Sequence, residues 1–272
     1  MSESAPVIDT PKNSTNDSAE PSEGDVAVID ELLTTYTSMK GEMAKVIVGQ
    51  DDVVERLLIA ILSRGHALLM GVPGLAKTLM VNSLSKVMSL DFTRIQFTPD
   101  LMPSDITGTD ILQETAEGRR EFEFVKGPIF ANIILADEIN RTPPKTQSAL
   151  LEAMAERQVS IGSQTYELPS LFLVMATQNP IEQEGTYPLP EAQLDRFLMH
   201  VRVSYPDAGA EQAILRLARS EAGGTHSRPE STVSQADIFS ARKALLDIHM
   251  AAAVEEYIIQ LIVGTREPDH YD

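Results

Sequence analysis

The sequence contains no cysteine and no tryptophan, and only 5% of its 272 residues are aromatic. Without cysteine the chain can form neither a disulfide bond nor a thiolate metal site, which fits a reducing compartment. The five histidines are scattered without ligand spacing, so a histidine metal centre is not expected either. An apolar fraction of 43% is sufficient for a core that is mostly aliphatic.

Long hydrophobic runs and basic residues are also scarce. No apolar run reaches the roughly 18 residues of a membrane span, and no basic-then-apolar signal opens the sequence. The 40 acidic residues outnumber the 22 basic ones, which gives a formal net charge of −18. This charge argues against a sequence-independent grip on nucleic acid or on an anionic membrane. We therefore expect a cytoplasmic protein with no nucleic-acid partner and no membrane insertion.

The pattern along the chain predicts three parts. Residues 1–25 are polar and acidic, which predicts a disordered tail. Residues 26–204 carry helical periodicity alternating with short buried strands, which is typical of an α/β domain. Residues 205–272 carry only helical periodicity, so we expect a small helical domain there. The predicted strands of the α/β domain cover residues 67–70, 92–97, 133–136, 171–176 and 197–203.

The stretch after the first of these strands predicts a phosphate-binding loop. Strand, glycine-rich loop and helix follow one another directly, which is the context that such a loop requires. Lys77 is predicted to reach the β- and γ-phosphates of a nucleotide, and the Thr78 hydroxyl to ligate Mg²⁺. The rest of the predicted cradle is Gly71, Val72, Pro73, Gly74, Leu75, Ala76 and Leu79. The alternative is an ordinary glycine-rich turn.

Ala76 departs from the generic pattern G-x-x-x-x-G-K-[ST], in which a second glycine precedes the lysine. A methyl group is the smallest addition to glycine. The loop therefore keeps its shape if Ala76 needs no positive φ.

Two adjacent acids, Asp137 and Glu138, end the predicted strand over residues 133–136. Adjacent carboxylates at such a place suit phosphoryl transfer. The first can hold Mg²⁺ through a water of the ion, and the second can orient or deprotonate the attacking water. A surface acidic pair is the alternative.

Asn179 and Arg196 are the remaining candidates for the chemistry. Asn179 follows the strand over residues 171–176, where its amide could position a water or the γ-phosphate. A turn-forming asparagine before proline is equally compatible with this spacing. Arg196 precedes the strand over residues 197–203 and could bind phosphate in bidentate fashion, unless it forms a surface salt bridge with Asp195 or a neighbour.

Two hairpins interrupt the α/β pattern. The first is predicted over residues 111–124 and the second over residues 158–168, with a turn at Gly162-Ser163. Because neither belongs to the sheet of an α/β fold, both are candidate functional appendages.

Three long motifs resemble the MoxR branch of the AAA+ ATPases. They are the phosphate loop, the run from Leu135 to Met154 and the run from Ala176 to Phe197, and the resemblance extends over about residues 46–266. It implies a P-loop AAA+ αβα core with a five-stranded parallel sheet, followed by a small all-helical lid. The family's lid ends in a helix with a second sensor arginine, which this sequence does not reach before Asp272, so we expect an incomplete lid.

The resemblance also implies roles for the candidate residues. Lys77 and Thr78 match the Walker A motif, and Asp137 and Glu138 match Walker B. Asn179 matches sensor 1. Arg196 matches the arginine finger that such proteins insert into the neighbouring subunit, and the segment near adenine is matched by Val48, Gly49 and Gln50.

As a function, the resemblance implies Mg²⁺-dependent ATP hydrolysis in a ring, usually a hexamer, with the two hairpins lining the pore or meeting clients. Family members act like chaperones that mature metalloenzymes or membrane-associated complexes, usually with a von Willebrand factor A-domain partner. A chelatase-type motor subunit and a non-hydrolysing nucleotide switch or scaffold remain alternatives. A nucleic-acid motor is opposed by the charge.

Overall fold

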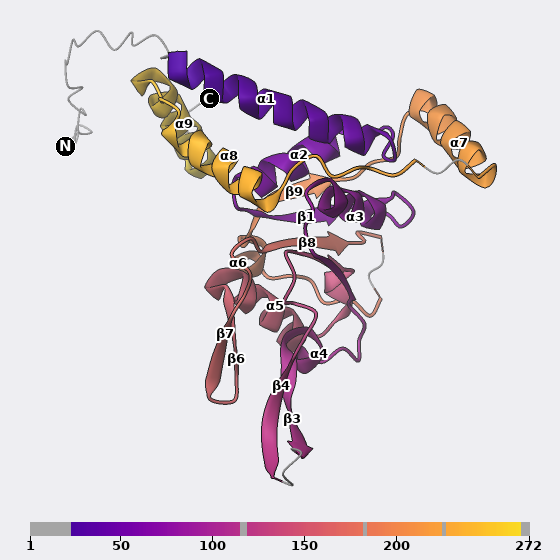
Figure 1. Ribbon diagram of the computed structural model, residues 1–272, viewed down its shortest axis with the longest axis vertical. Helices are drawn as coiled ribbons and strands as arrows, with labels where there is room; N and C mark the ends of the chain where they lie inside the picture. The colour runs from indigo at the N-terminus through magenta and orange to yellow at the C-terminus, as the bar shows by residue number, and fades with distance from the viewer. Residues whose placement is uncertain (1–22, 115–118, 182–183, 225–226, 268–272) are drawn as a thin grey trace, which may run out of the picture. The chain divides into compact units, whose positions relative to one another are not determined.

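The computed structural model describes residues 23–114, 119–181, 184–224 and 227–267 (Figure 1). Nearly all of the predicted tail therefore lies outside the described residues. Two compact units result: one spans Leu33–Lys243, and the other combines residues 23–32 with residues 244–267. The domain boundaries predicted near residues 25 and 205 stay predictions. No helix in the described ranges has the length and apolarity that a membrane crossing requires.

The larger unit is built on one five-stranded sheet, whose strand order is β2-β5-β8-β1-β9. Every neighbouring pair in this sheet is parallel. The predicted fold class is therefore confirmed. Because the strands are parallel, their carboxyl ends meet at one edge, where open α/β sheets bind their ligands. The strands are β1 (His66–Met70), β2 (Phe92–Gln96), β5 (Ile133–Asp137), β8 (Leu173–Gln178) and β9 (Phe197–Arg202).

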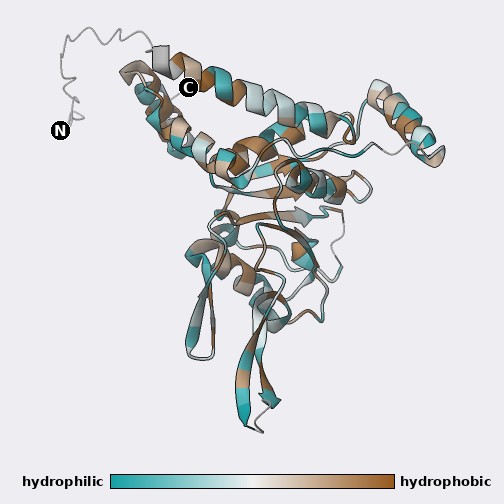
Figure 2. Ribbon diagram, in the orientation of Figure 1, coloured by the Kyte–Doolittle hydropathy of each residue, from teal (hydrophilic) through white to brown (hydrophobic). Residues whose placement is uncertain are grey.

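Helices cover both faces of the sheet. Successive side chains of a strand point to opposite faces. Leu69 and Leu135 accordingly pack in one apolar cluster with residues of α2 (Asp51–Leu62) and α3 (Lys77–Val87). Leu68 and Ile134 belong to a second cluster, with residues of α4 (Pro103–Thr107) and α5 (Pro144–Glu156). Burial on both faces explains why the strands read as continuous apolar runs, as the brown of β8 in Figure 2 illustrates.

Both predicted hairpins are confirmed. The first pairs β3 (Gly108–Glu114) with β4 (Arg120–Lys126), and residues 115–118 at its tip lie outside the description. The second pairs β6 (Gln158–Ile161) with β7 (Gln164–Glu167). Figure 1 shows both projecting from the same side of the sheet. They are joined by the stacked rings of Phe124 and Tyr166, whose centroids lie 4.0 Å apart.

The region after the sheet is helical, as predicted. It comprises α7 (Ala208–Ala222), α8 (Gln235–Asp247) and α9 (Ala252–Arg266). Of these, α7 lies within the larger unit, whereas α8 crosses the division between the two units. At the other end of the chain, α1 (Glu23–Ala44) crosses the same division.

Candidate functional site

The loop between β1 and α3 requires glycine at its first position. A Cβ on Gly71 would lie 2.6 Å from the carbonyl oxygen of Val203, which is closer than side-chain carbons approach backbone. Gly74 has a φ of 87°, a conformation that residues with a side chain rarely adopt. The glycines of the motif are therefore needed for the shape of the loop itself.

Ala76 corrects one expectation. Its φ is 55° and its ψ is 20°, so it adopts the left-handed conformation immediately before α3, and the condition of a non-positive φ is not met. The left-handed region costs an L-residue about 1–2 kcal/mol. A methyl group is nevertheless tolerated there, because the strain falls on a single residue at the junction of loop and helix.

The first turn of α3 presents a positive end without a counter-charge. No side chain caps this helix, and its first turn contains no acidic residue. Such a helix N-terminus attracts an anion. Lys77 lies at the same point, where its ammonium donates to the carbonyl oxygens of Gly71 and Val72. Partial burial lowers the pKa of Lys77, while the charges of Asp137 and Glu138 act in the opposite direction.

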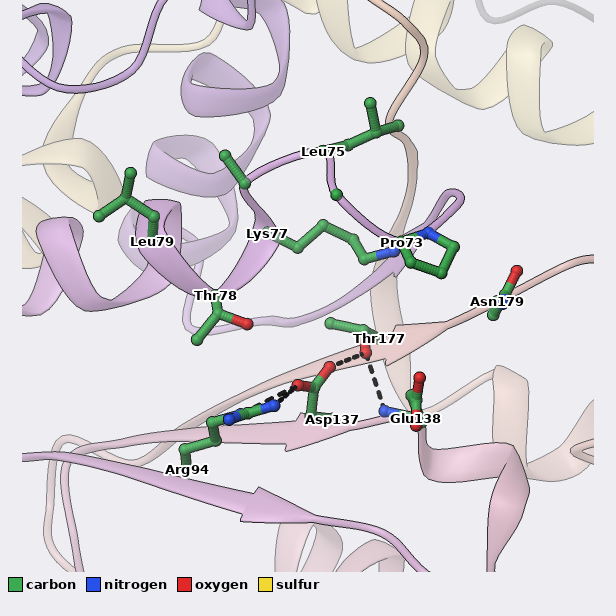
Figure 3. A pocket seen from close by; sticks show the side chains of 12 residues that line it. Pro73, Leu75, Lys77, Thr78, Leu79, Arg94, Asp137, Glu138, Thr177 and Asn179 are labelled. Carbon is green, nitrogen blue, oxygen red and sulfur yellow. Dashed lines mark hydrogen bonds and ion pairs between the residues drawn. The ribbon is translucent and has the colours of Figure 1, made fainter. Parts of the chain in front are cut away.

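A cavity of about 460 Å³ lies between this loop and the carboxyl ends of the strands (Figure 3). It brings together most of the candidates that are distant in the sequence: Lys77 and Thr78 from the loop side, Asp137 and Glu138 from β5 and its end, and Asn179 from the end of β8. Its lining is Pro73, Gly74, Leu75, Ala76, Lys77, Thr78, Leu79, Arg94, Asp137, Glu138, Thr177 and Asn179.

Asp137 is held on both carboxylate oxygens, although it is only 8% exposed. Its Oδ1 accepts a hydrogen bond of 2.5 Å from the Thr177 hydroxyl, which in turn accepts one of 2.9 Å from the amide of Glu138. Its Oδ2 accepts from Nε of Arg94 at 2.9 Å and from Nη2 of the same guanidinium at 2.6 Å. These bonds, drawn in Figure 3, fix the carboxylate at the wall of the cavity.

Glu138 has a left-handed backbone, with φ at 57° and ψ at 49°. Its Oε2 accepts a hydrogen bond of 2.9 Å from the side-chain amide of Gln96. The same oxygen lies 3.2 Å from Nε of Arg141, in the short helix Ile139–Arg141. Strained residues other than glycine concentrate at functional sites. The carboxylate is therefore held in place by polar contacts at the cavity rather than exposed as part of a surface acidic pair.

Three residues in or beside the cavity were not predicted from the sequence: Arg94, Gln96 and Thr177. Thr177 and Gln96 lie at the carboxyl ends of β8 and β2, and Arg94 lies two residues before Gln96. One signal was available for the pair on β2. Residues two apart on a strand share a face, and two polar side chains in that relation stand out in a short strand of a buried sheet.

Asn179 forms a turn contact and also lies at the cavity. It is 6% exposed, and its side-chain oxygen accepts a hydrogen bond of 3.2 Å from the amide of Ile181, which is a turn-forming contact. The residue also lines the cavity. The two are compatible because the turn uses only the oxygen of the side chain.

Arg196 does not lie in the phosphate cavity of its own chain. It follows the short helix α6 (Glu191–Leu194) and is exposed. It lines a different cavity of about 380 Å³, together with His66 and Asp195. Within the described ranges Arg196 forms no salt bridge with Asp195 or another acid.

The segment Val48-Gly49-Gln50 lies beside the phosphate loop. Val48 and Gln50 line a further cavity of about 300 Å³, which shares Gly74, Leu75, Ala76 and Leu79 with the phosphate cavity. Gly49 has a φ of 72° and packs so closely against α7 that a Cβ would lie 2.5 Å from the Cβ of Ala210. The side-chain amide of Gln50 donates to the carbonyl of Ser204 at 2.9 Å.

Comparisons with a family model and with individual proteins indicate the same family. A model of the "ATPase family associated with various cellular activities (AAA)" matches residues 66–199. Chaperone MoxR1 of Mycobacterium tuberculosis is 49% identical over 84% of this chain and 59% of its own length. Uncharacterized protein YeaC of Bacillus subtilis is 47% identical over 82% of this chain and 68% of its own length. The chain thus spans about three fifths of the mycobacterial relative.

A solved structure agrees with these relatives. A crystal structure from Cytophaga hutchinsonii, described as that of a candidate ATPase, superimposes with a TM-score of 0.78 at 48% identity. The match covers 92% of this chain and 73% of the other. Fold, loop and relatives lead to the same assignment, and the chain belongs to the MoxR family of AAA+ ATPases.

Proposed function

We propose that the chain binds ATP with Mg²⁺ and hydrolyses it, as the ATPase core of a chaperone-like assembly. The observation that carries this proposal is the phosphate cavity. It combines an uncapped helix N-terminus and Lys77 on one side with Asp137 and Glu138 on the other. The first pair of features suits the phosphates of a nucleotide, and the second suits a metal ion and a water.

The donors in the cavity fit Mg²⁺ only together with a nucleotide. The described residues contain no group of three or more histidine, cysteine or acidic side chains that could hold a metal ion. Mg²⁺ typically takes one or two protein oxygens and completes its shell with waters and substrate phosphates. Thr78 and Asp137 offer such hard oxygen ligands. When bound, Mg²⁺ would neutralise charge on the phosphate oxygens.

Under this proposal the candidate residues of the site have separate tasks. Lys77 exchanges its loop carbonyls for phosphate oxygens, which bind an ammonium more strongly because they are charged. Glu138 accepts a proton from the attacking water, and Asn179 helps to place that water. The segment around Val48 lies beside the apolar cavity next to the loop, which suits the adenine ring.

The proposal includes self-association into a ring, with a hexamer as the expected size. Arg196 is exposed and lies in a cavity that shares no lining residue with the phosphate cavity. This position supports a role for Arg196 at the nucleotide of a neighbouring subunit. There its guanidinium would stabilise charge that develops on the γ-phosphoryl oxygens.

The chaperone role, a protein client and a von Willebrand factor A-domain partner are proposed on the family alone, as is the cytoplasmic location. One feature of the structure supports contact with a client. On the hairpin β3–β4, Phe122 is 76% exposed and Leu112 is 54% exposed. Exposed apolar side chains on a projecting hairpin are suited to protein contact.

Two variants test the ATPase. Lys77→Ala is expected to weaken nucleotide binding by at least about tenfold, because a hydrogen bond to a charged group is lost. Glu138→Gln is expected to bind nucleotide like the parent and to lose turnover by about 10²-fold or more, the usual contribution of a general base. Binding is measured by fluorescent nucleotide titration and turnover by phosphate release.

Matched controls lie on the same elements as the two variants or close to them. Lys86→Ala, at the exposed far end of α3, and Glu152→Gln, on the exposed side of α5, should behave like the parent. Parent-like turnover in Glu138→Gln would mean that the base is misassigned. Tight binding without turnover in the parent chain, at concentrations where oligomers form, would instead favour the non-hydrolysing scaffold.

A further inference from the structure

Arg94 occupies Oδ2 of Asp137, the carboxylate to which the proposed function assigns Mg²⁺. Its guanidinium makes two bonds to Oδ2, at 2.9 Å and 2.6 Å, and Oδ1 is already engaged by Thr177. Among the described residues, no other cation forms a salt bridge with Asp137. In this arrangement Arg94 is the counter-ion of the carboxylate that would help to hold Mg²⁺.

The two partners of this pair differ in their freedom to move. The Asp137 side chain is 11% exposed and fixed by Thr177, whereas the Arg94 side chain is 47% exposed and reaches over from β2. β2 is the edge strand of the sheet beside β5. A long side chain that is half in solvent can leave its partner without disturbing the core. The pair can therefore open on the side of Arg94 alone.

Arg94 is also the first member of a hydrogen-bonded chain that ends on the proposed base. Its Nη2 donates to the side-chain oxygen of Gln96 at 2.6 Å, and the amide of Gln96 donates to Oε2 of Glu138 at 2.9 Å. Gln96 has its oxygen oriented by the guanidinium, so its amide is directed at Glu138. The state of Asp137 and the position of Glu138 are thus connected through one guanidinium.

We propose that Arg94 is a positioning residue that competes with Mg²⁺ for Asp137 and releases it only when the metal–nucleotide complex enters. The guanidinium and the metal ion repel each other, so the metal binds this carboxylate more weakly while Arg94 stays in contact with it. When Arg94 leaves, Gln96 loses the contact that orients it, and one of the two contacts that hold Oε2 of Glu138 is weakened. The inference rests on the proposed function, because it requires a Mg²⁺-dependent nucleotide site.

The test measures the affinity for ADP, carrying a fluorescent label, as a function of free Mg²⁺ in the full chain. Arg94→Met removes the charge at nearly constant length, and it should lower the Mg²⁺ midpoint by about tenfold or more, since a charge-assisted pair no longer has to be broken. The affinity in EDTA should stay within about twofold of the parent, because Arg94 is assigned no phosphate contact. Arg94→Lys keeps the charge but not the paired N–H groups of the guanidinium. Its Mg²⁺ midpoint should therefore fall between those of the parent and of Arg94→Met.

Arg141→Met is the matched control. It removes the same charge from beside Glu138, which lines the cavity, but Arg141 has no salt bridge to Asp137. Its Mg²⁺ midpoint should move much less than that of Arg94→Met. A second readout is the melting temperature in EDTA without nucleotide. Arg94→Met should lower it by about 2 °C or more, because Asp137 loses both hydrogen bonds from the guanidinium.

Three results with the variants would overturn the inference. An unchanged Mg²⁺ midpoint in Arg94→Met would show that no competition takes place. An equal shift in Arg141→Met would reduce the effect to the general field of the cavity. Weaker ADP binding in EDTA would place Arg94 on the phosphates. If the parent chain binds ADP without any dependence on Mg²⁺, the proposed function and this inference both fail, whereas a dependence that Arg94→Met leaves unchanged refutes the inference alone.

Discussion

His66 at the start of β1 should make the stability of the fold depend on pH. Its ring is buried, its Nδ1 accepts a hydrogen bond of 2.9 Å from the amide of Val174, and it packs edge-on against Phe172. Burial lowers the pKa of His66 to about 4, with a hydrogen bond from the ring to the backbone carbonyl of Met154 opposing the shift and the charge of Arg157 adding to it. The folded protein therefore keeps this imidazole neutral in mildly acidic solution.

The sign and size of the effect follow from linkage. Between pH 6.5 and about 4 the unfolded chain binds a proton at His66 that the folded chain excludes, so stability is lost as the pH falls through this window. For one site with these two pKa values, the loss between pH 7.5 and pH 5.5 is about 1.3 kcal/mol. The lower pH stays above the sequence pI of about 4.6, so the protein keeps a negative charge that favours solubility.

The assay is urea unfolding of the parent and of His66→Asn at both pH values. The asparagine oxygen replaces Nδ1 as an acceptor for Val174 but does not titrate. The free energy of unfolding should fall by about 1 kcal/mol more in the parent than in the variant over this interval. His200→Asn, at an exposed position of β9, should fall with the parent. Equal falls in the parent and in His66→Asn would refute the reasoning.

Two further predictions concern assembly and the loop. Arg196→Ala and Glu138→Gln should each be inactive alone. Mixed at concentrations where oligomers form, they should recover phosphate release, because some interfaces then pair an intact Glu138 with an intact Arg196. No recovery in the mixture would contradict action between subunits. Ala76→Gly should change the free energy of unfolding by less than about 1 kcal/mol, since relief of left-handed strain offsets the greater entropy of the unfolded chain. Ala76→Val should clearly lower the free energy of unfolding measured in urea. An unchanged value for Ala76→Val would contradict the strained φ at this position.

The elements of the sheet were predictable because each buried strand interrupts the helical periodicity. The apolar run Ile133–Ala136 is short, bounded by polar residues and followed by two acids, and the structure has β5 there. The phosphate loop was predictable for a related reason, since its glycines meet local steric requirements that hold in any protein. Local chemistry of this kind is readable from the sequence.

The contacts of Asp137 were not predictable in the same way. Arg94 lies 43 residues before it in the sequence, and the two meet only because β2 pairs with β5 in register. Neither the composition of β2 nor its period says which strand will lie beside it. A sequence-based interpretation can place a carboxylate at the end of a strand, but its partner depends on the order of the strands.

Three departures from local preference lie together at the phosphate cavity, although Arg64, Ser89 and Arg157 also have positive φ outside it. Ala76 and Glu138 both have left-handed backbones without being glycine, and Lys77 is partly buried with a lowered pKa. Each of these features costs free energy, and all three residues line the same cavity. Natural sequences satisfy local preferences almost everywhere and violate them mainly where a function requires it. The strain and burial at this cavity therefore support a functional site by an argument that does not depend on the motif.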